Sequence, residues 1–139
     1  MAKDRRRVLI VEDHQELRTA TVVLVQSWGH EVRSAADGDR GLAIALAWKP
    51  HVVCVDLALP QVNGDEVARR IIAASDRERP LLIAISGYGR DVEWEIASMA
   101  GFDVFLLKPH DVDLLEAAIR GDALPDEIVL SSRPMRVRQ

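Results

Sequence analysis

Acidic residues and a lysine stand at the ends of separate apolar runs in this chain of 139 residues. Glu12 and Asp13 follow one run, Asp56 ends a second, and Lys108 follows a third. Because the carboxyl ends of parallel strands meet at one edge of an open α/β sheet, we expect these side chains to converge. Carboxylates about 4 Å apart repel one another by roughly 4 kcal/mol at an effective dielectric of about 20, so such a site requires a cation. Magnesium fits best, since it is held by one or two carboxylates and keeps positions for water and phosphate oxygens.

These residue types are suited to phosphoryl transfer. A carboxylate can accept a phosphoryl group covalently when a metal ion and a cation neutralise the charge on the transferred oxygens. We therefore predict that Asp56 is the nucleophile and Asp13 a direct metal ligand, while Glu12 acts through water or orients the site. Asp56 itself and the backbone carbonyl of Ala58 complete the predicted ligand set. The ammonium group of Lys108 is expected to pair with a phosphate oxygen.

A hydroxyl group completes the predicted site. Ser86 ends a further strand-like run and is placed to donate a hydrogen bond to the same phosphate. Each residue alone has an ordinary alternative: Asp13 as a helix cap, Ser86 as a turn residue, and Lys108 as a solvated surface charge. The functional interpretation rests on the set, because the acid pair, the single acid, the hydroxyl and the lysine each end a different strand.

Apolar runs of strand length alternate with stretches of helical period along the chain. This alternation is typical of an α/β fold in which a parallel sheet carries helices on both faces. We predict strands over Val8–Val11, Glu31–Ala35, Val52–Val55, Leu81–Ser86 and Val104–Leu107, and helices over Glu16–Trp28, Gly41–Trp48, Asp65–Ala74, Asp91–Ala100 and Asp111–Arg120.

Helical spacing also predicts which side chains face the core. The inward residues should be Leu17, Leu24 and Trp28 in the first helix, Leu42, Ala45 and Leu46 in the second, Val67, Ile71 and Ala74 in the third, and Val92, Ile96 and Met99 in the fourth.

Length and composition set limits on the kind of protein. The chain is long enough for one domain, which we place at residues 1–121, followed by a tail over 122–139 that we expect to be mobile, apart from a short docked segment around Ile128–Leu130. A net charge of −4 argues against direct nucleic-acid binding. The lone Cys54 cannot form an internal disulfide and favours a cytosolic chain. Neither a signal-peptide core nor a membrane span is apparent, so we expect no membrane partner and a cytoplasmic location.

Taken together, the motifs resemble the receiver domain of bacterial two-component response regulators. The resemblance implies a flavodoxin-like five-stranded sheet in order 2-1-3-4-5. It also implies that Asp56 takes a phosphoryl group from a phosphohistidine of a sensor histidine kinase or histidine phosphotransfer protein, with Mg²⁺ required. Such a domain is no enzyme beyond its own phosphorylation and dephosphorylation. The matching motifs are Val11-Glu-Asp13, Asp56 with Leu59-Pro60 and Asn63-Gly64, Ser86-Gly87, Phe105 and Lys108-Pro109.

The resemblance further implies a conformational switch. In that family, phosphorylation draws a hydroxyl residue toward the phosphate, an aromatic residue turns inward behind it, and the fourth and fifth helices shift toward an arrangement that binds a downstream protein. Ser86 and Phe105 match these two roles. The physical basis is a population shift, since the new dianion gains partners in only one of two packings. As an isolated phenylalanine in a strand, Phe105 would instead be read as plain core.

Two helix surfaces are predicted to bind partners. Trp94 lies off the apolar stripe of its helix and is expected to be partly exposed, which makes it a candidate contact. The alternative is that its ring folds down over a neighbouring helix. The run Thr21–Val25 covers more than one helical face, so Val22 or Val25 should be exposed. By resemblance, that helix docks the histidine donor.

Other functions stay open at this point. The same fold could serve as an interaction module that needs no phosphate, or as the receiver part of a hybrid kinase, and a homodimer is compatible with either. A haloacid-dehalogenase-type phosphatase also uses a strand-end aspartate and magnesium. Those enzymes carry a second acid two residues further on, where this chain has Ala58, so we expect no phosphatase turnover.

Overall fold

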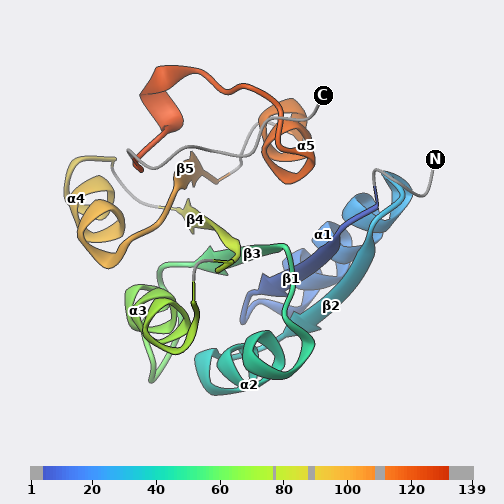
Figure 1. Ribbon diagram of the computed structural model, residues 1–139, viewed down its shortest axis with the longest axis horizontal. Coiled ribbons are helices and arrows are strands. Elements are labelled where there is room, and N and C mark those ends of the chain that lie inside the picture. Colours follow the sequence, from blue (N-terminus) through green and yellow to red (C-terminus); the bar gives the residue numbers. More distant parts are fainter. Residues whose placement is uncertain (1–4, 77, 88–89, 109–111, 132–139) are drawn as a thin grey trace.

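A parallel sheet of five strands in the order β2-β1-β3-β4-β5 forms the centre of the computed structural model (Figure 1). The structure describes residues 5–76, 78–87, 90–108 and 112–131. Strands and helices alternate along the chain, as predicted from the sequence. The elements are β1 (Arg7–Val11), α1 (Gln15–Ser27), β2 (Glu31–Ala35), α2 (Gly38–Trp48), β3 (Val52–Asp56), α3 (Gly64–Ala74), β4 (Leu81–Ser86), α4 (Arg90–Ala100), β5 (Val104–Leu107), α5 (Val112–Arg120) and the short 3-10 helix η2 (Asp126–Ile128).

The predicted fold class is confirmed, and the strand bounds agree to within a residue. The register of β3 continues through Asp56, which pairs with Ile85, so the predicted nucleophile is the last residue of its strand. Gly29 and Gly101, which follow α1 and α4, adopt φ values of 96° and 98°. These left-handed conformations favour glycine and end the two helices. The predicted start of the last helix at Asp111 lies outside the described residues.

Alternate strand residues feed two separate hydrophobic cores. Leu9, Val53 and Phe105 point to the core beneath α2, α3 and α4. Val8 and Cys54 point to the core beneath α1 and α5. Both faces of the sheet are therefore covered, which explains the nearly continuous apolar strands. The carboxyl ends of the strands stay uncovered by helices and can carry a site.

The predicted inward face of α4 is wrong. Val92 and Met99 are 69% and 80% exposed, whereas Ala97 and Ala100 are buried. Trp94 packs against the core on the same side as the two alanines. The prediction followed the helical spacing of the larger apolar side chains. The small alanines instead face the sheet, because they let the helix approach it closely. Leu46 of α2 and Ala74 of α3 are likewise exposed, contrary to prediction.

The prediction of an exposed Val25 is also wrong, because its side chain is 0% exposed in the core under α1. Val22 is half-buried and packs against the same core, while Val23 between them is 59% exposed. The apolar residues of α1 cover more than one face, and spacing alone cannot decide which face meets the sheet. The stripe that includes Val22, Val25 and Trp28 does so.

The segment that follows α5 returns to the sheet. Val129 forms an antiparallel bridge with Val104 at the start of β5. Ile128 packs against the core under α1 and α5, and Leu130 against the core on the opposite face. The domain boundary at residue 121 and a mobile tail stay predictions, and residues 132–139 lie outside the described part of the chain.

Candidate functional site

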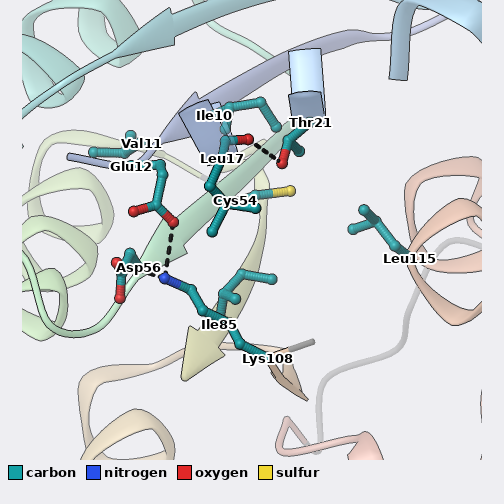
Figure 2. Close-up of a pocket in the computed structure, with 10 residues that line it drawn as sticks. All are labelled: Ile10, Val11, Glu12, Leu17, Thr21, Cys54, Asp56, Ile85, Lys108 and Leu115. Carbon is teal, nitrogen blue, oxygen red and sulfur yellow. Dashed lines mark hydrogen bonds and ion pairs between the residues drawn. The ribbon is translucent and has the colours of Figure 1, made fainter. Parts of the chain in front are cut away.

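The side chains singled out from the sequence meet at one edge of the sheet (Figure 2). Glu12 follows β1, Asp56 ends β3, and Lys108 follows β5. The sheet order places β1 beside β3, and β4 separates β3 from β5. Because β4 ends at Ser86, the long side chain of Lys108 can extend across the end of that strand to reach the two acids.

Lys108 forms a two-way ion pair at the centre of the site. Its Nζ atom lies 2.9 Å from Glu12 Oε1 and 2.9 Å from Asp56 Oδ2. Both carboxylates belong to residues that are only 5% exposed. Asp13 is exposed beside them, and one carboxylate oxygen from each of the three acids lies within 4.8 Å of the others. One ammonium group thus pairs with two buried acids, and a third, exposed acid lies next to them.

The pKa values of Glu12 and Lys108 are both raised above their ordinary values. Burial raises the pKa of Glu12 above its ordinary value, although hydrogen bonds from Lys108 and from the backbone N–H of His14 oppose the rise. Burial alone would lower the pKa of Lys108, but its bonds to Asp56 and Glu12 outweigh this and raise it. Lys108 is therefore held as an ammonium ion that compensates the buried acids.

Backbone groups orient the acids. Asp56 Oδ1 accepts a hydrogen bond of 2.9 Å from the N–H of Ala58, and Glu12 Oε2 accepts one of 3.1 Å from the N–H of His14. The side chain of His14, and not that of Asp13, caps α1 by accepting from the N–H of Leu17 at 3.3 Å. The helix-cap alternative for Asp13 therefore does not apply, and its carboxylate stays exposed toward the cluster.

Ser86 and Phe105 lie behind this cluster. Ser86 is buried at the end of β4, and its backbone carbonyl accepts a 2.6 Å hydrogen bond from the N–H of Lys108. Phe105 is buried and packs edge to face with Trp94, with ring centroids 5.4 Å apart. The ring of Trp94 thus packs on a strand and not on a neighbouring helix, and the residue stays partly exposed as predicted. A chain of contacts runs from Lys108 along β5 to α4.

Residues 8–120 match the family of response regulator receiver domains. The chain is 30% identical over 113 residues to the transcriptional regulatory protein AfsQ1 of Streptomyces coelicolor, covering 81% of this chain and 49% of AfsQ1. It is 34% identical over 117 residues to the CAI-1 autoinducer sensor kinase/phosphatase CqsS of Vibrio cholerae, covering 82% of this chain and 17% of CqsS. This chain is a response regulator receiver domain. It spans about half or less of the length of these two relatives.

A solved receiver domain has the same architecture. The receiver domain of the sensor histidine kinase PA1611 from Pseudomonas aeruginosa superposes with a TM-score of 0.76 at 25% identity, covering 83% of this chain and 94% of that one. That structure holds a magnesium ion coordinated in its active-site cleft. Receiver domains are signalling modules of two-component systems, which agrees with the family expected from the motifs.

The carboxylates of this receiver domain suit a magnesium ion. The cluster of Glu12, Asp13 and Asp56 offers oxygen donors alone, which are the ligands that this hard cation prefers. Asp13 and Ala58 are exposed, so the cluster is open to solvent on one side. An opening of this kind leaves room for water and phosphate oxygens around an ion.

The receiver domain also positions its acceptor through Gly64, whose role the sequence did not reveal. An added Cβ atom at this first residue of α3 would collide with the backbone oxygen of Asp56 and come within 2.8 Å of Leu57 Cα. Only glycine lets α3 begin against the end of β3. The Asn63-Gly64 motif therefore has a steric cause, which fixes the backbone on which Asp56 stands.

Arg18 is a further supporting residue that sequence analysis missed. Its guanidinium donates a 2.9 Å hydrogen bond to the backbone carbonyl of Glu12 and reaches the carbonyl of Asp13 at 3.4 Å. The contact fastens the acidic turn to α1. The spacing of an arginine six residues after Glu12 carries no signal by itself, because many arginines on helices are solvated.

A small apolar pocket lies behind the acceptor. Leu17 and Thr21 of α1 face Leu115 of α5 across it, with Cys54 and Ile85 from the sheet. Figure 2 shows Lys108 reaching from this wall toward Asp56 and Glu12. Burial raises the pKa of the Cys54 thiol to about 12, so the thiol is neutral. Glu12, Asp56 and Lys108 also line the pocket.

Among the described residues, no helix is both long enough and apolar enough to cross a membrane.

Proposed function

We propose that this receiver domain accepts a phosphoryl group onto Asp56 from a phosphohistidine in a magnesium-dependent reaction. The observation that carries the proposal is the placement of Lys108 Nζ 2.9 Å from both Asp56 and Glu12, beside the exposed carboxylate of Asp13. A lone acid at a strand end would not require this compensation. The arrangement supplies a nucleophile, a cation and an oxygen-rich metal site at one point.

Each side chain has a defined task in this reaction. Asp56 attacks phosphorus, so that an O–P bond forms while the P–N bond to the donor histidine breaks and the electron pair returns to the imidazole. The N–H of Ala58 holds Oδ1 of Asp56, which leaves the oxygen now paired with Lys108 as the attacking atom. Lys108 then exchanges that carboxylate oxygen for a phosphate oxygen. Mg²⁺, held by Glu12, Asp13, Asp56 and the carbonyl of Ala58, would neutralise charge on the transferred oxygens.

Ser86 and Phe105 would transmit the phosphorylation of Asp56 to the surface of α4. The backbone bond between Ser86 and Lys108 ties the end of β4 to the residue that meets the phosphate. Phe105 reaches α4 through Trp94, and α4 presents Val92 and Met99 to solvent. These contacts support an output surface on α4 and α5 that binds a downstream protein. The exposed apolar residues replace Trp94 as the candidate contacts on α4.

The donor would be a sensor histidine kinase or a histidine phosphotransfer protein that docks on α1. Val25 cannot take part because it is buried, and Val22 is half-buried. Val23, with Thr19 and Ala20 exposed beside it, is the better candidate. Small side chains let a partner helix approach closely. Two-component kinases can carry their own receiver, so a place within a hybrid kinase stays an alternative. A lone, buried cysteine fits a cytoplasmic location.

Intact-mass spectrometry tests the proposal directly. The protein is incubated with acetyl phosphate and magnesium, beside Asp56→Asn and beside a sample in EDTA. We expect the mass to rise by one phosphoryl group only in the wild type incubated with acetyl phosphate and magnesium, and not in Asp56→Asn or in EDTA. A wild-type mass that stays unchanged with both acetyl phosphate and a phosphorylated histidine-kinase donor would refute phosphoryl acceptance and favour a phosphate-independent interaction module.

A further inference from the structure

The two edge strands of the sheet are protected in different ways. At the β2 edge, Glu31 and Arg33 are exposed. Arg33 also lies over the ring of Trp48, with its guanidinium carbon 4.6 Å from the ring centroid. Charged side chains on an edge strand prevent its open backbone groups from pairing with another chain. β2 therefore carries its own protection.

β5 has no such charges. Its four residues, Val104–Leu107, are all apolar. The acids and bases at its two ends are already engaged: Asp103 is buried and pairs with Arg79 at 3.2 Å, and Lys108 pairs with Asp56 and Glu12. An uncharged apolar strand at a sheet edge is a template for edge-to-edge association.

The C-terminal segment covers part of this edge. We call residues 122–131 the strap; in Figure 1 it leaves α5 and passes over to β5. Val129 bridges Val104 in antiparallel orientation, and the N–H of Leu130 donates a 2.9 Å hydrogen bond to the carbonyl of Asp103. Leu124 and Ile128 anchor the strap in one core, and Leu130 in the other.

The strap lies beyond the part of the chain that matches the receiver family, which ends at residue 120. The strap therefore lies outside the matched domain. Its contacts satisfy backbone groups at the start of β5 and cover apolar surface on both sides of the sheet. The strap supplies by backbone pairing the protection that β2 obtains from charge.

We propose that the strap prevents β5 from pairing with the β5 edge of a second copy of this chain. A second copy fits because two identical edges, placed antiparallel about a twofold axis, present matching donors and acceptors to each other. Next to the edge, Leu107 and Val112 are 41% and 45% exposed, and Met99 of α4 is more exposed still. Release of the strap would expose the apolar surface that it now covers, next to these apolar residues. No charge on β5 opposes the association of two such edges.

Sedimentation velocity of the full chain tests this inference without phosphate. The variant Ile128→Asp/Leu130→Asp places charges at two strap anchors and should undock the strap. The control Ala123→Asp adds one charge at an exposed position of the same segment. We expect wild type and control to sediment as monomers, and the double variant to sediment at twice the monomer mass. Adding Leu107→Lys at the β5 edge should return the double variant to a monomer.

The outcomes separate cleanly. A double variant that is folded by circular dichroism, exchanges the backbone amide of residue 130 rapidly and stays monomeric would overturn the proposal, as would a dimer that Leu107→Lys does not dissociate. If the two charges unfold the chain, Ile128→Ser carries the same comparison: dimerisation at lower concentration than wild type supports the proposal, and an unchanged monomer overturns it. None of these results depends on whether Asp56 accepts a phosphoryl group.

Discussion

Lys108 supplies the positive charge that compensates the two buried acids of the site. Two nearly buried carboxylates would repel each other strongly, and the raised pKa of Glu12 reflects its burial. The ammonium of Lys108 compensates both acids from 2.9 Å. A bound cation would supply the same compensation from the Asp13 side. Lysine and metal should therefore be partly interchangeable in how they stabilise the fold.

This interchange leads to a prediction for Lys108→Ala. Without metal, the variant should lose about 2 kcal/mol of unfolding free energy, because Glu12 and Asp56 stay buried without their partner. Magnesium should then raise the melting temperature of the variant more than that of the wild type, since the ion relieves a larger repulsion. Thermal unfolding with EDTA and with magnesium measures both effects.

Arg40→Ala is the matched control for this experiment. Arg40 is a well-exposed cation on α2, with 80% of its side chain accessible, so its removal should alter stability by no more than about 0.5 kcal/mol. Its magnesium response should equal that of the wild type. An equal magnesium shift in Lys108→Ala and wild type would mean that the metal and the lysine do not act on the same charges.

Among the elements, strands and their ends could be predicted, whereas helix orientation could be predicted only in part: Val67 and Ile71 of α3 are buried as expected, but α4 turns a different face to the sheet. Each strand is marked by an apolar run followed by polar or turn residues, so the placement of Asp56 and Lys108 followed from the sequence. Helix faces depend on which residues fit against the twisted sheet. In α4 the fit is made by Ala97, Ala100 and Trp94, which periodicity ranked below Val92 and Met99. The supporting contacts of His14 and Arg18 involve backbone atoms, which sequence spacing does not locate.

The orientation of α4 can be tested by a pair of substitutions. Trp94→Ala removes the ring that packs on Phe105 and should lower the unfolding free energy by about 2 kcal/mol, because a large side chain is lost from the core edge. Met99→Ala truncates a side chain of the same helix that is 80% exposed, and should change the unfolding free energy by less than about 0.5 kcal/mol. Urea unfolding followed by circular dichroism compares them. If Met99→Ala lost more unfolding free energy than Trp94→Ala, the helix would have the orientation that its apolar spacing predicts.

At the scale of the whole molecule, the acceptor site and the two cores share one sheet. Val55 and Phe105 belong to one core, and Cys54 and Leu106 to the other, on the same strands that end at the site. Rigid strands fix the distance between Asp56 and Lys108. The docked strap joins the two cores at the opposite end of β5. Its apolar anchors were visible in the sequence, but their long-range pairing with Val104 had no local signal.

The stability of the whole domain at alkaline pH provides a last prediction. Burial raises the pKa of Cys54 from 9.0 to about 12. Between these values the unfolded chain has lost the thiol proton and the folded chain has kept it, so the unfolded state binds fewer protons. The unfolding free energy should therefore fall as pH rises through this window, by about 1.4 kcal/mol per pH unit from this group.

The variant Cys54→Ala isolates that contribution. It should be less stable than wild type by about 1 kcal/mol at pH 8, because a small cavity replaces the sulfur. Its stability should decline less steeply above pH 9, so the two unfolding free energies should converge and then cross. Lys108 also loses its proton at high pH, but it does so in both proteins and cancels in the difference. Urea unfolding at several pH values under reducing conditions measures the two curves, and parallel curves would show that the thiol ionises equally in the folded and unfolded chains.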